Sequence, residues 1–176
     1  VWAYAIEGKG AVSLDWLAEK VLEDIETVGL SKERVIVKTD QEASIVQLQK
    51  EVAKRRDQGT AAENSRVGDS NSNGKIERTI REVKGMIRTL RGSLVRRIGT
   101  TIRLDAAVVP WMVRHAGYIL TRCRVLEDGK TAMQKMNGRR VDCPWIPFGE
   151  PVLFKFPKVL NMLGDFRDRF ETGFGV

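Results

Sequence analysis

Apolar side chains recur along this chain with two different periods, which separate helical segments from strands. Segment 14–28 has an apolar residue at every third or fourth position, as one face of a helix does. Ser13 and Gly29 are suited to cap its two ends. Segments 1–7 and 34–40 are short and rich in aromatic or β-branched residues, which favour strands. The predicted order of strand, helix and strand is typical of a βαβ unit in an α/β domain.

Helical periodicity returns in segment 41–56 and again in a basic region after residue 73. In that region an apolar stripe repeats at intervals of four, three, four and three residues, formed by Ile76, Ile80, Val83, Ile87 and Leu90. Segment 57–73 lies between the two helical patterns and is rich in Gly, Asn and Ser. We therefore predict a long loop there, with room for one short strand.

The rest of the chain alternates linkers with shorter elements. Segment 92–100 is basic and predicts a second linker. Segment 104–125 predicts one or two helices, with Pro110 near the start of the second. Segment 128–140 predicts a turn and a short helix, and 147–157 predicts a strand of a small β unit.

Composition narrows the classes of function that this fold could serve. The 176 residues suffice for one domain with a sizeable core, and 42% of them are hydrophobic. The 30 lysines and arginines exceed the 23 acids, which favours a polyanionic partner, nucleic acid first. No apolar run approaches the roughly 20 residues that span a bilayer, so we expect no membrane partner. The two cysteines lack metal-ligand spacing and fit a reducing compartment, which argues against a zinc site.

Two carboxylates stand at positions that suit chemistry. Asp40 ends a predicted strand, and ligands of open α/β sheets gather beyond that end of the strands. The alternative is that Asp40 caps the following helix. Glu77 opens a predicted basic helix and points about 100° away from its apolar stripe. The alternative for Glu77 is a surface ion pair with Arg81, four residues later.

The sequence around these two acids resembles the catalytic core of retroviral and retrotransposon integrases, the D,D-35-E polynucleotidyl transferases. The strand that carries that family's second aspartate is similar to "IVKTDQE", and its loop and glutamate helix are similar to "DSNSNGKIERTIREVK". In this chain 36 residues separate Asp40 from Glu77, within one residue of the family's signature. The family's later helices and β segment are similar to "PWMVRHAGYILTR", "KTAMQKMNGRR" and "FGEPVLFKFP".

The resemblance implies a ribonuclease-H-like fold, with a mixed sheet flanked by helices over residues 1–140 and a C-terminal β extension over 141–176. It implies that Asp40 and Glu77 are catalytic residues that hold Mg²⁺ or Mn²⁺. It also implies that DNA is bound by basic residues of the glutamate helix, namely Lys75, Arg78, Arg81, Lys84 and Arg88. In the complete protein we expect DNA end processing and strand transfer in the nucleus, with a homo-oligomer as a further expectation by analogy.

The chain also departs from the family pattern. Gln41 and Glu42 stand where the family has Asn-Gly, and residues 131–133 lack its proline. The family's first aspartate has no counterpart here, and Glu7 lies on a different strand from that aspartate. We therefore expect a fragment that lacks the first strands and is inactive alone. Two other interpretations stay open: a non-catalytic nucleic-acid-binding remnant, and a general ribonuclease.

Other residues with reactive or aromatic side chains have simpler expected roles. His115 is the sole histidine and lies in an apolar helical pattern, so we expect it to pack rather than catalyse. Cys123 and Cys143 are expected as packed or free thiols. Trp111 and Trp145 are expected in the core or at an interface rather than as platforms for nucleic-acid bases.

Overall fold

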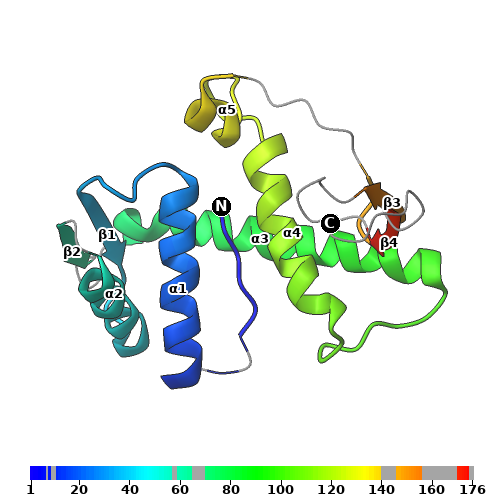
Figure 1. The fold of residues 1–176 in the computed structure, drawn as a ribbon, viewed down its shortest axis with the longest axis horizontal. Coiled ribbons are helices and arrows are strands. Elements are labelled where there is room, and N and C mark those ends of the chain that lie inside the picture. Colours follow the sequence, from blue (N-terminus) through cyan, green and yellow to red (C-terminus); the bar gives the residue numbers. More distant parts are fainter. Residues whose placement is uncertain are drawn as a thin grey trace, which may run out of the picture. The chain divides into compact units, whose positions relative to one another are not determined.

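The chain forms a helix-rich α/β protein whose strands make two small sheets (Figure 1). The computed structural model describes residues 1–6, 8, 11–56, 59–64, 70–139, 146–155 and 170–174. By internal packing the chain divides into two compact units, Val1–Lys84 and Gly85–Val176. The predicted domain boundary at 140/141 falls outside the described residues and stays a prediction.

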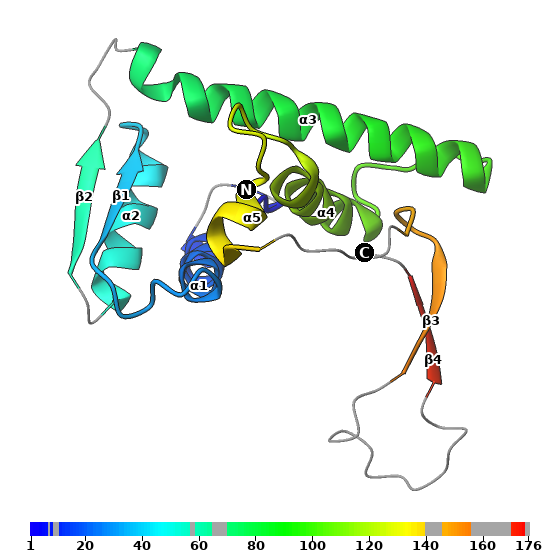
Figure 2. The ribbon, with the colours of Figure 1, turned by 90° about the horizontal axis from the view of Figure 1, so that it is seen from above.

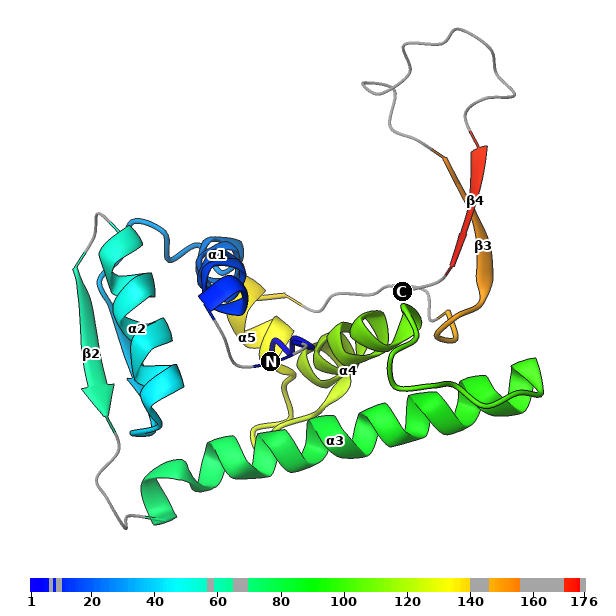
Figure 3. The same ribbon diagram turned by 90° about the horizontal axis from the view of Figure 1, so that it is seen from below.

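The first unit contains a βαβ unit, but this unit begins at the predicted strand 34–40 and not at segment 1–7. Its helices and strands are α1 (Ala11–Thr27), β1 (Val35–Thr39), α2 (Ala43–Arg55) and β2 (Thr60–Asn64). β1 and β2 are parallel, in a register that runs from Val35 opposite Thr60 to Thr39 opposite Asn64. α2 lies along the two strands and also packs on α1 (Figure 3). The short strand for which the predicted loop left room is therefore present, as β2.

The ends of α1 follow local backbone chemistry. Gly29 adopts a left-handed conformation with φ of 77°. Its N–H donates to the carbonyl of Glu26 at 2.8 Å, and the N–H of Leu30 donates to that of Ile25 at 3.0 Å. This pair of bonds satisfies the last carbonyls of the helix, and the left-handed position favours glycine. Gly29 is thus confirmed as the cap, whereas Ser13 lies inside α1 and the predicted N-terminal cap is wrong.

Gln49 joins α2 to both strands. Its side chain is 2% exposed, and Nε2 donates to the carbonyl oxygens of Val37 in β1 at 2.5 Å and Glu63 in β2 at 3.3 Å. A buried amide needs such partners, because an unpaired polar group in the core is costly. Gln49 therefore fixes α2 against the half of the sheet where the two strands end.

The segment before α1 is not a strand, and the prediction for residues 1–7 is wrong for the described residues 1–6. A strand needs a neighbouring strand for its hydrogen bonds, and none of the described strands pairs with this segment. The segment instead contacts α1 through Tyr4, whose hydroxyl donates to the buried Asp24 carboxylate at 2.6 Å. The Tyr4 ring also meets Trp16 edge to face at 5.5 Å.

α3 (Ser70–Ile98) is one helix of 29 residues, longer at both ends than predicted (Figure 2). The predicted loop ends before Ser70 instead of at residue 73, and the predicted linker at 92–100 is mostly helix. Gly92 costs about 1 kcal/mol in a helix relative to alanine, but Leu90 and Leu94 on either side of it are buried. Burial of those side chains outweighs the weak propensity, so the helix continues to Ile98.

Beyond α3, the second unit contains the helices and the strand that the sequence predicts, together with one strand that it does not predict, β4 (Phe170–Phe174). Its other elements are α4 (Val108–Cys123), α5 (Ala132–Asn137) and β3 (Pro151–Lys155), and β4 is antiparallel to β3. Pro110 lies in the first turn of α4, where a missing N–H is harmless. Thr131 and Gln134 form a capping box at the start of α5. None of the described helices is long and apolar enough to cross a membrane.

The described core of the second unit is drawn from α3, the segment between α3 and α4, α4 itself and the turn before β3. Its buried apolar side chains are Leu90, Leu94, Ile102, Met112, Ala116, Leu120 and Phe148. Gly149 approaches Leu94 so closely that a Cβ atom there would lie 2.9 Å from Leu94 Cδ1. Arg97 of α3 pairs with Glu150 at 2.8 Å and also donates to the carbonyl of Phe148. These contacts attach the turn before β3 to α3.

Candidate metal and nucleic-acid site

Asp40 follows the last residue of β1 and lies at the carboxyl edge of the parallel strand pair. Its side chain is exposed, and Oδ1 accepts a hydrogen bond from the N–H of Glu42 at 3.2 Å. Glu42, not Asp40, is the N-cap residue of α2, and no side chain caps that helix. Asp40 is therefore not the N-cap residue of α2, and the alternative that it caps this helix is wrong. Oδ2 has no partner among the described residues and is open to a ligand.

Two side-chain pairs join β1 and β2 at the same edge. Lys38 and Glu63 form an ion pair of 2.8 Å between exposed groups. One position further on, the hydroxyl of Thr39 donates to Oδ1 of Asn64 at 3.2 Å. Asn64 thus lies at the end of β2 beside the residue that precedes Asp40. Sequence reasoning missed it because β2 was hidden in a predicted loop, and its only signal is its place before the NG-containing segment.

Glu77 lies in the exposed N-terminal part of α3. It forms no hydrogen bond or ion pair with the residues that the structure describes. The i,i+4 pair of this helix segment is instead Arg78 with Glu82, at 3.3 Å. The predicted alternative, a surface pair of Glu77 with Arg81, is therefore not formed. The Glu77 carboxylate is open to a ligand in the same way as Oδ2 of Asp40.

The continuous helix sorts the five predicted basic residues into two groups, although all five are exposed. At 100° per residue, Arg81, Lys84 and Arg88 lie within about 40° of Glu77 around the helix axis. Arg78 lies about 100° away and Lys75 about 160° away. We call Arg81, Lys84 and Arg88 the basic face of α3. Lys75 and Arg78 stay predicted DNA contacts but do not share a face with Glu77.

The apolar stripe of α3 is not uniformly buried. Ile76 and Ile80 are each 48% exposed, whereas Leu90 is 9% exposed. The stripe is thus a core element only in the C-terminal half of α3. Its N-terminal half, where Glu77 lies, keeps apolar side chains exposed.

The described residues do not complete a metal centre. Among them no group of three or more His, Cys, Asp or Glu side chains is placed to hold a metal ion. No described hydrogen bond links Asp40 to Glu77. Glu7, the residue considered as a substitute for the first aspartate, lies outside the described part of the chain, as do Cys143 and Trp145.

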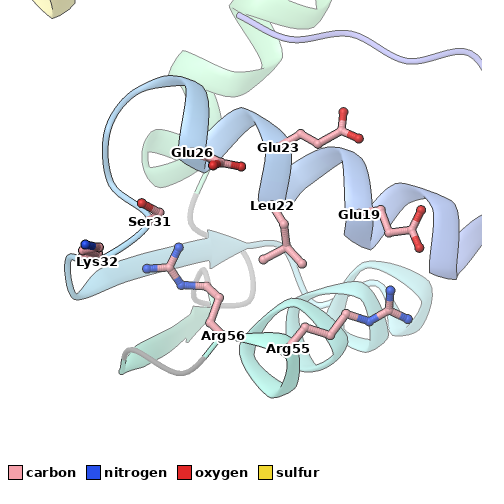
Figure 4. Close-up of a pocket in the computed structure, with 8 residues that line it drawn as sticks. All are labelled: Glu19, Leu22, Glu23, Glu26, Ser31, Lys32, Arg55 and Arg56. Carbon is pink, nitrogen blue, oxygen red and sulfur yellow. The ribbon is translucent and has the colours of Figure 1, made fainter.

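A groove in the first unit lies between the end of α1 and the end of α2, and Figure 4 shows its lining residues. Arg55 there is bonded to Glu51 at 2.7 Å and to Asp15. Arg56 donates to the carbonyl oxygens of Leu30 at 3.1 Å and Glu33 at 2.6 Å. Both arginines thus hold α2 to its neighbours. None of the predicted site residues lines this groove.

His115 and Trp111 lie on α4 in different environments. His115 is 7% exposed, and its ring lies 5.1 Å from that of Phe148 and 5.7 Å from that of Tyr118. Burial lowers the pKa of His115, which favours the neutral ring. These contacts agree with a packing role. Trp111 is 55% exposed, so its predicted place in the core is wrong and an interface stays the prediction.

No known protein family and no curated protein matches this chain by sequence. The resemblance to integrases therefore depends on the motifs and on the spacing of the two carboxylates. The structure adds where those residues lie: Asp40 at the carboxyl edge of a parallel strand pair, and Glu77 exposed on a long basic helix.

Proposed function

We propose that this chain is part of the catalytic core of a retroelement integrase, with a ribonuclease-H-like fold, and that it binds DNA. In the complete protein this core performs Mg²⁺-dependent DNA end processing and strand transfer. One observation supports the proposal most. A parallel β–α–β unit places Asp40 directly after β1, and the next element is a long basic helix with an exposed Glu77 that pairs with none of the described residues.

The small size of the β1–β2 sheet supports the proposed ribonuclease-H-like fold. β1 and β2 make a two-stranded parallel sheet, and parallel sheets are usually larger and covered on both faces. Ile36 of β1 is 68% exposed on the face away from α2. In a ribonuclease-H-like sheet further strands extend this pair and further helices cover its second face. The exposure of Ile36, and of Ile76 and Ile80 on α3, is what we expect of such a partial core.

The chemistry of the two carboxylates fits a hard divalent cation. Mg²⁺ prefers oxygen ligands and keeps several water molecules, so few protein ligands suffice. Oδ2 of Asp40 and the Glu77 carboxylate would hold it. When bound, the cation neutralises charge on the phosphate that reacts. In the described part of the chain no group of three or more His, Cys, Asp or Glu side chains is placed to hold a metal ion, so we expect the 176-residue chain alone not to catalyse strand transfer.

The basic face of α3 accounts for the nucleic-acid part of the proposal. Arg81 and Lys84 are exposed on the side of the helix that carries Glu77. Each can neutralise one phosphate and release counterions, which makes binding depend on salt. Glu77 repels the same phosphates, so a cation held by Glu77 removes that repulsion. We therefore expect Mg²⁺ to strengthen DNA binding.

The runner-up is a nucleic-acid-binding remnant without catalysis, and the lack of a metal-holding group of three or more side chains among the described residues favours it. Binding assays separate the candidates: the chain is titrated onto duplex DNA and onto an RNA–DNA hybrid of the same sequence, with EDTA or with Mg²⁺. We expect DNA binding that Mg²⁺ strengthens, and an uncut RNA strand. DNA binding with the same affinity in EDTA and in Mg²⁺ would support the non-catalytic remnant. Cleavage of the RNA strand would support a ribonuclease. Failure to bind any duplex at about 100 mM salt would sink the proposal.

A further inference from the structure

Asn64 is hydrogen-bonded across the strand pair at the carboxyl edge of β1 and β2. The parallel register places Thr39 directly opposite Asn64. The Thr39 hydroxyl donates to Oδ1 of Asn64 at 3.2 Å. In this orientation of the amide, the Nδ2 group is on the side away from Thr39.

The Nδ2 group leaves two hydrogen-bond donors at this edge. Asn64 is exposed, and Nδ2 has no partner among the described residues. Asp40 follows Thr39 in the chain, so the amide donors and the Asp40 carboxylate share one end of the sheet. Ligands of open α/β sheets gather at that end of the strands. An N–H donor there fits an anionic oxygen and cannot coordinate a cation.

We propose that Asn64 donates a hydrogen bond from Nδ2 to a backbone phosphate oxygen of the nucleic acid bound beside Asp40. Thr39 is the positioning residue that holds the amide with its donors toward the ligand. Neutral side chains such as asparagine often make phosphate contacts of this kind, which fix the register of the nucleic acid without reading its sequence. This inference rests on the proposed function, since it requires that the chain bind DNA at this edge.

The contact predicts a signature that separates Asn64 from the basic face of α3. Arg81 neutralises a phosphate, so Arg81→Ala lowers the slope of log affinity against log salt by about 0.9. Asn64 is neutral and releases no counterion of its own. Asn64→Ala should therefore weaken DNA binding by roughly fivefold, as loss of one hydrogen bond does, without changing the salt slope.

The test measures duplex DNA binding by the full chain in EDTA, across a salt series, for wild type and five variants, among them Arg81→Ala and Asn64→Ala. Asn64→Asp keeps the acceptor for Thr39 but replaces the donors with a charge, and Thr39→Val removes the hydroxyl. Asn137→Asp on α5 introduces the same charge far along the sequence and serves as the control. We expect Asn137→Asp to bind DNA about as tightly as wild type. Thr39→Val should bind more weakly, Asn64→Ala more weakly still, and Asn64→Asp most weakly of all.

The possible results separate the role of Asn64 from DNA binding as a whole. Equal affinities for Asn64→Asp and Asn137→Asp, while Arg81→Ala still lowers affinity and salt slope, would overturn the role of Asn64 and leave DNA binding intact. A loss on Asn64→Ala that occurs with Mg²⁺ but not in EDTA would identify a cation ligand instead, and would also overturn it. Absence of DNA binding by the wild type would remove both the proposed function and this inference. Unchanged far-UV circular dichroism in each variant shows that folding is not the cause.

Discussion

Arg78 and Glu82 form an ion pair of 3.3 Å one turn apart on α3, and Glu77, the residue before Arg78, has no such partner in the described structure. The helix could equally have paired Glu77 with Arg81, since that spacing is the same. The observed pairing leaves one carboxylate exposed between cationic side chains. An unpaired acid in that setting is suited to a cation, which is why Glu77 is central to the proposed site.

The basic face of α3 gives the first prediction. Arg81→Ala and Lys84→Ala should each weaken duplex DNA binding several-fold and lower the salt slope by about 0.9, because each removes one phosphate contact. Lys50→Ala is the matched control: it removes the same charge from the exposed side of α2, where no DNA contact is predicted. Fluorescence anisotropy over a salt series measures both quantities. An equal loss for Lys50→Ala would show that binding does not use the basic face of α3.

Gln49 gives a prediction on stability. Gln49→Leu keeps the volume of the side chain but leaves the carbonyls of Val37 and Glu63 without their buried donor. We expect a loss of about 1–3 kcal/mol in the free energy of unfolding of the first unit. Gln47→Leu on the exposed side of α2 is the control and should change little. Urea unfolding followed by circular dichroism compares them, and similar midpoints for both variants would contradict the bridging role.

His115 predicts how stability varies with pH. Burial lowers its pKa in the folded state, so below about pH 6.5 the unfolded state binds more protons than the folded state. Stability is therefore full above that pH, starts to fall below it, and stops falling below the lowered folded pKa. His115 is the only histidine, so few other groups titrate in this range.

Thermal unfolding of wild type and His115→Leu between pH 5 and 8 checks this. The melting temperature of the variant should depend less on pH than that of the wild type. The terminal amine of Val1, whose pKa is also lowered by burial, is present in both proteins and cancels in the comparison. Parallel pH profiles would show that protonation of His115 does not limit stability.

Much of the fold could be predicted from local periodicity, and the errors have identifiable causes. β1 and α2 could be predicted because the periodicity of their apolar residues is strong within a few residues. β2 has the sequence "TAAEN" and little apolar signal, since four of its five residues are exposed. It is a strand because β1 offers a parallel partner, and such a partner cannot be seen in five residues. Segment 1–6 has the opposite problem: it has strand-like residues but no described partner.

The candidate site, like the fold, could be predicted from the sequence only in part. Asp40 and Glu77 could be identified from their spacing and flanking motifs. The length of α3 could not, because "SNSNG" has the composition of a loop, yet the structure has it in the first turns of the helix. Asn64 could not be identified either, since its importance comes from the register that sets it opposite Thr39. Sequence thus indicated the two proposed charged ligands, and only the pairing between strands brought Asn64 into the proposed site.

Manganese binding by the full chain tests most directly the claim that Asp40 and Glu77 hold a divalent cation. Free Mn²⁺ is measured by electron paramagnetic resonance during titration of wild type, Asp40→Asn, Glu77→Gln and Glu19→Gln, the last being an exposed acid of α1 with no predicted role. We expect Asp40→Asn and Glu77→Gln each to weaken binding by about tenfold or more, and Glu19→Gln to match wild type. Wild-type affinity in both Asp40→Asn and Glu77→Gln would contradict the metal site.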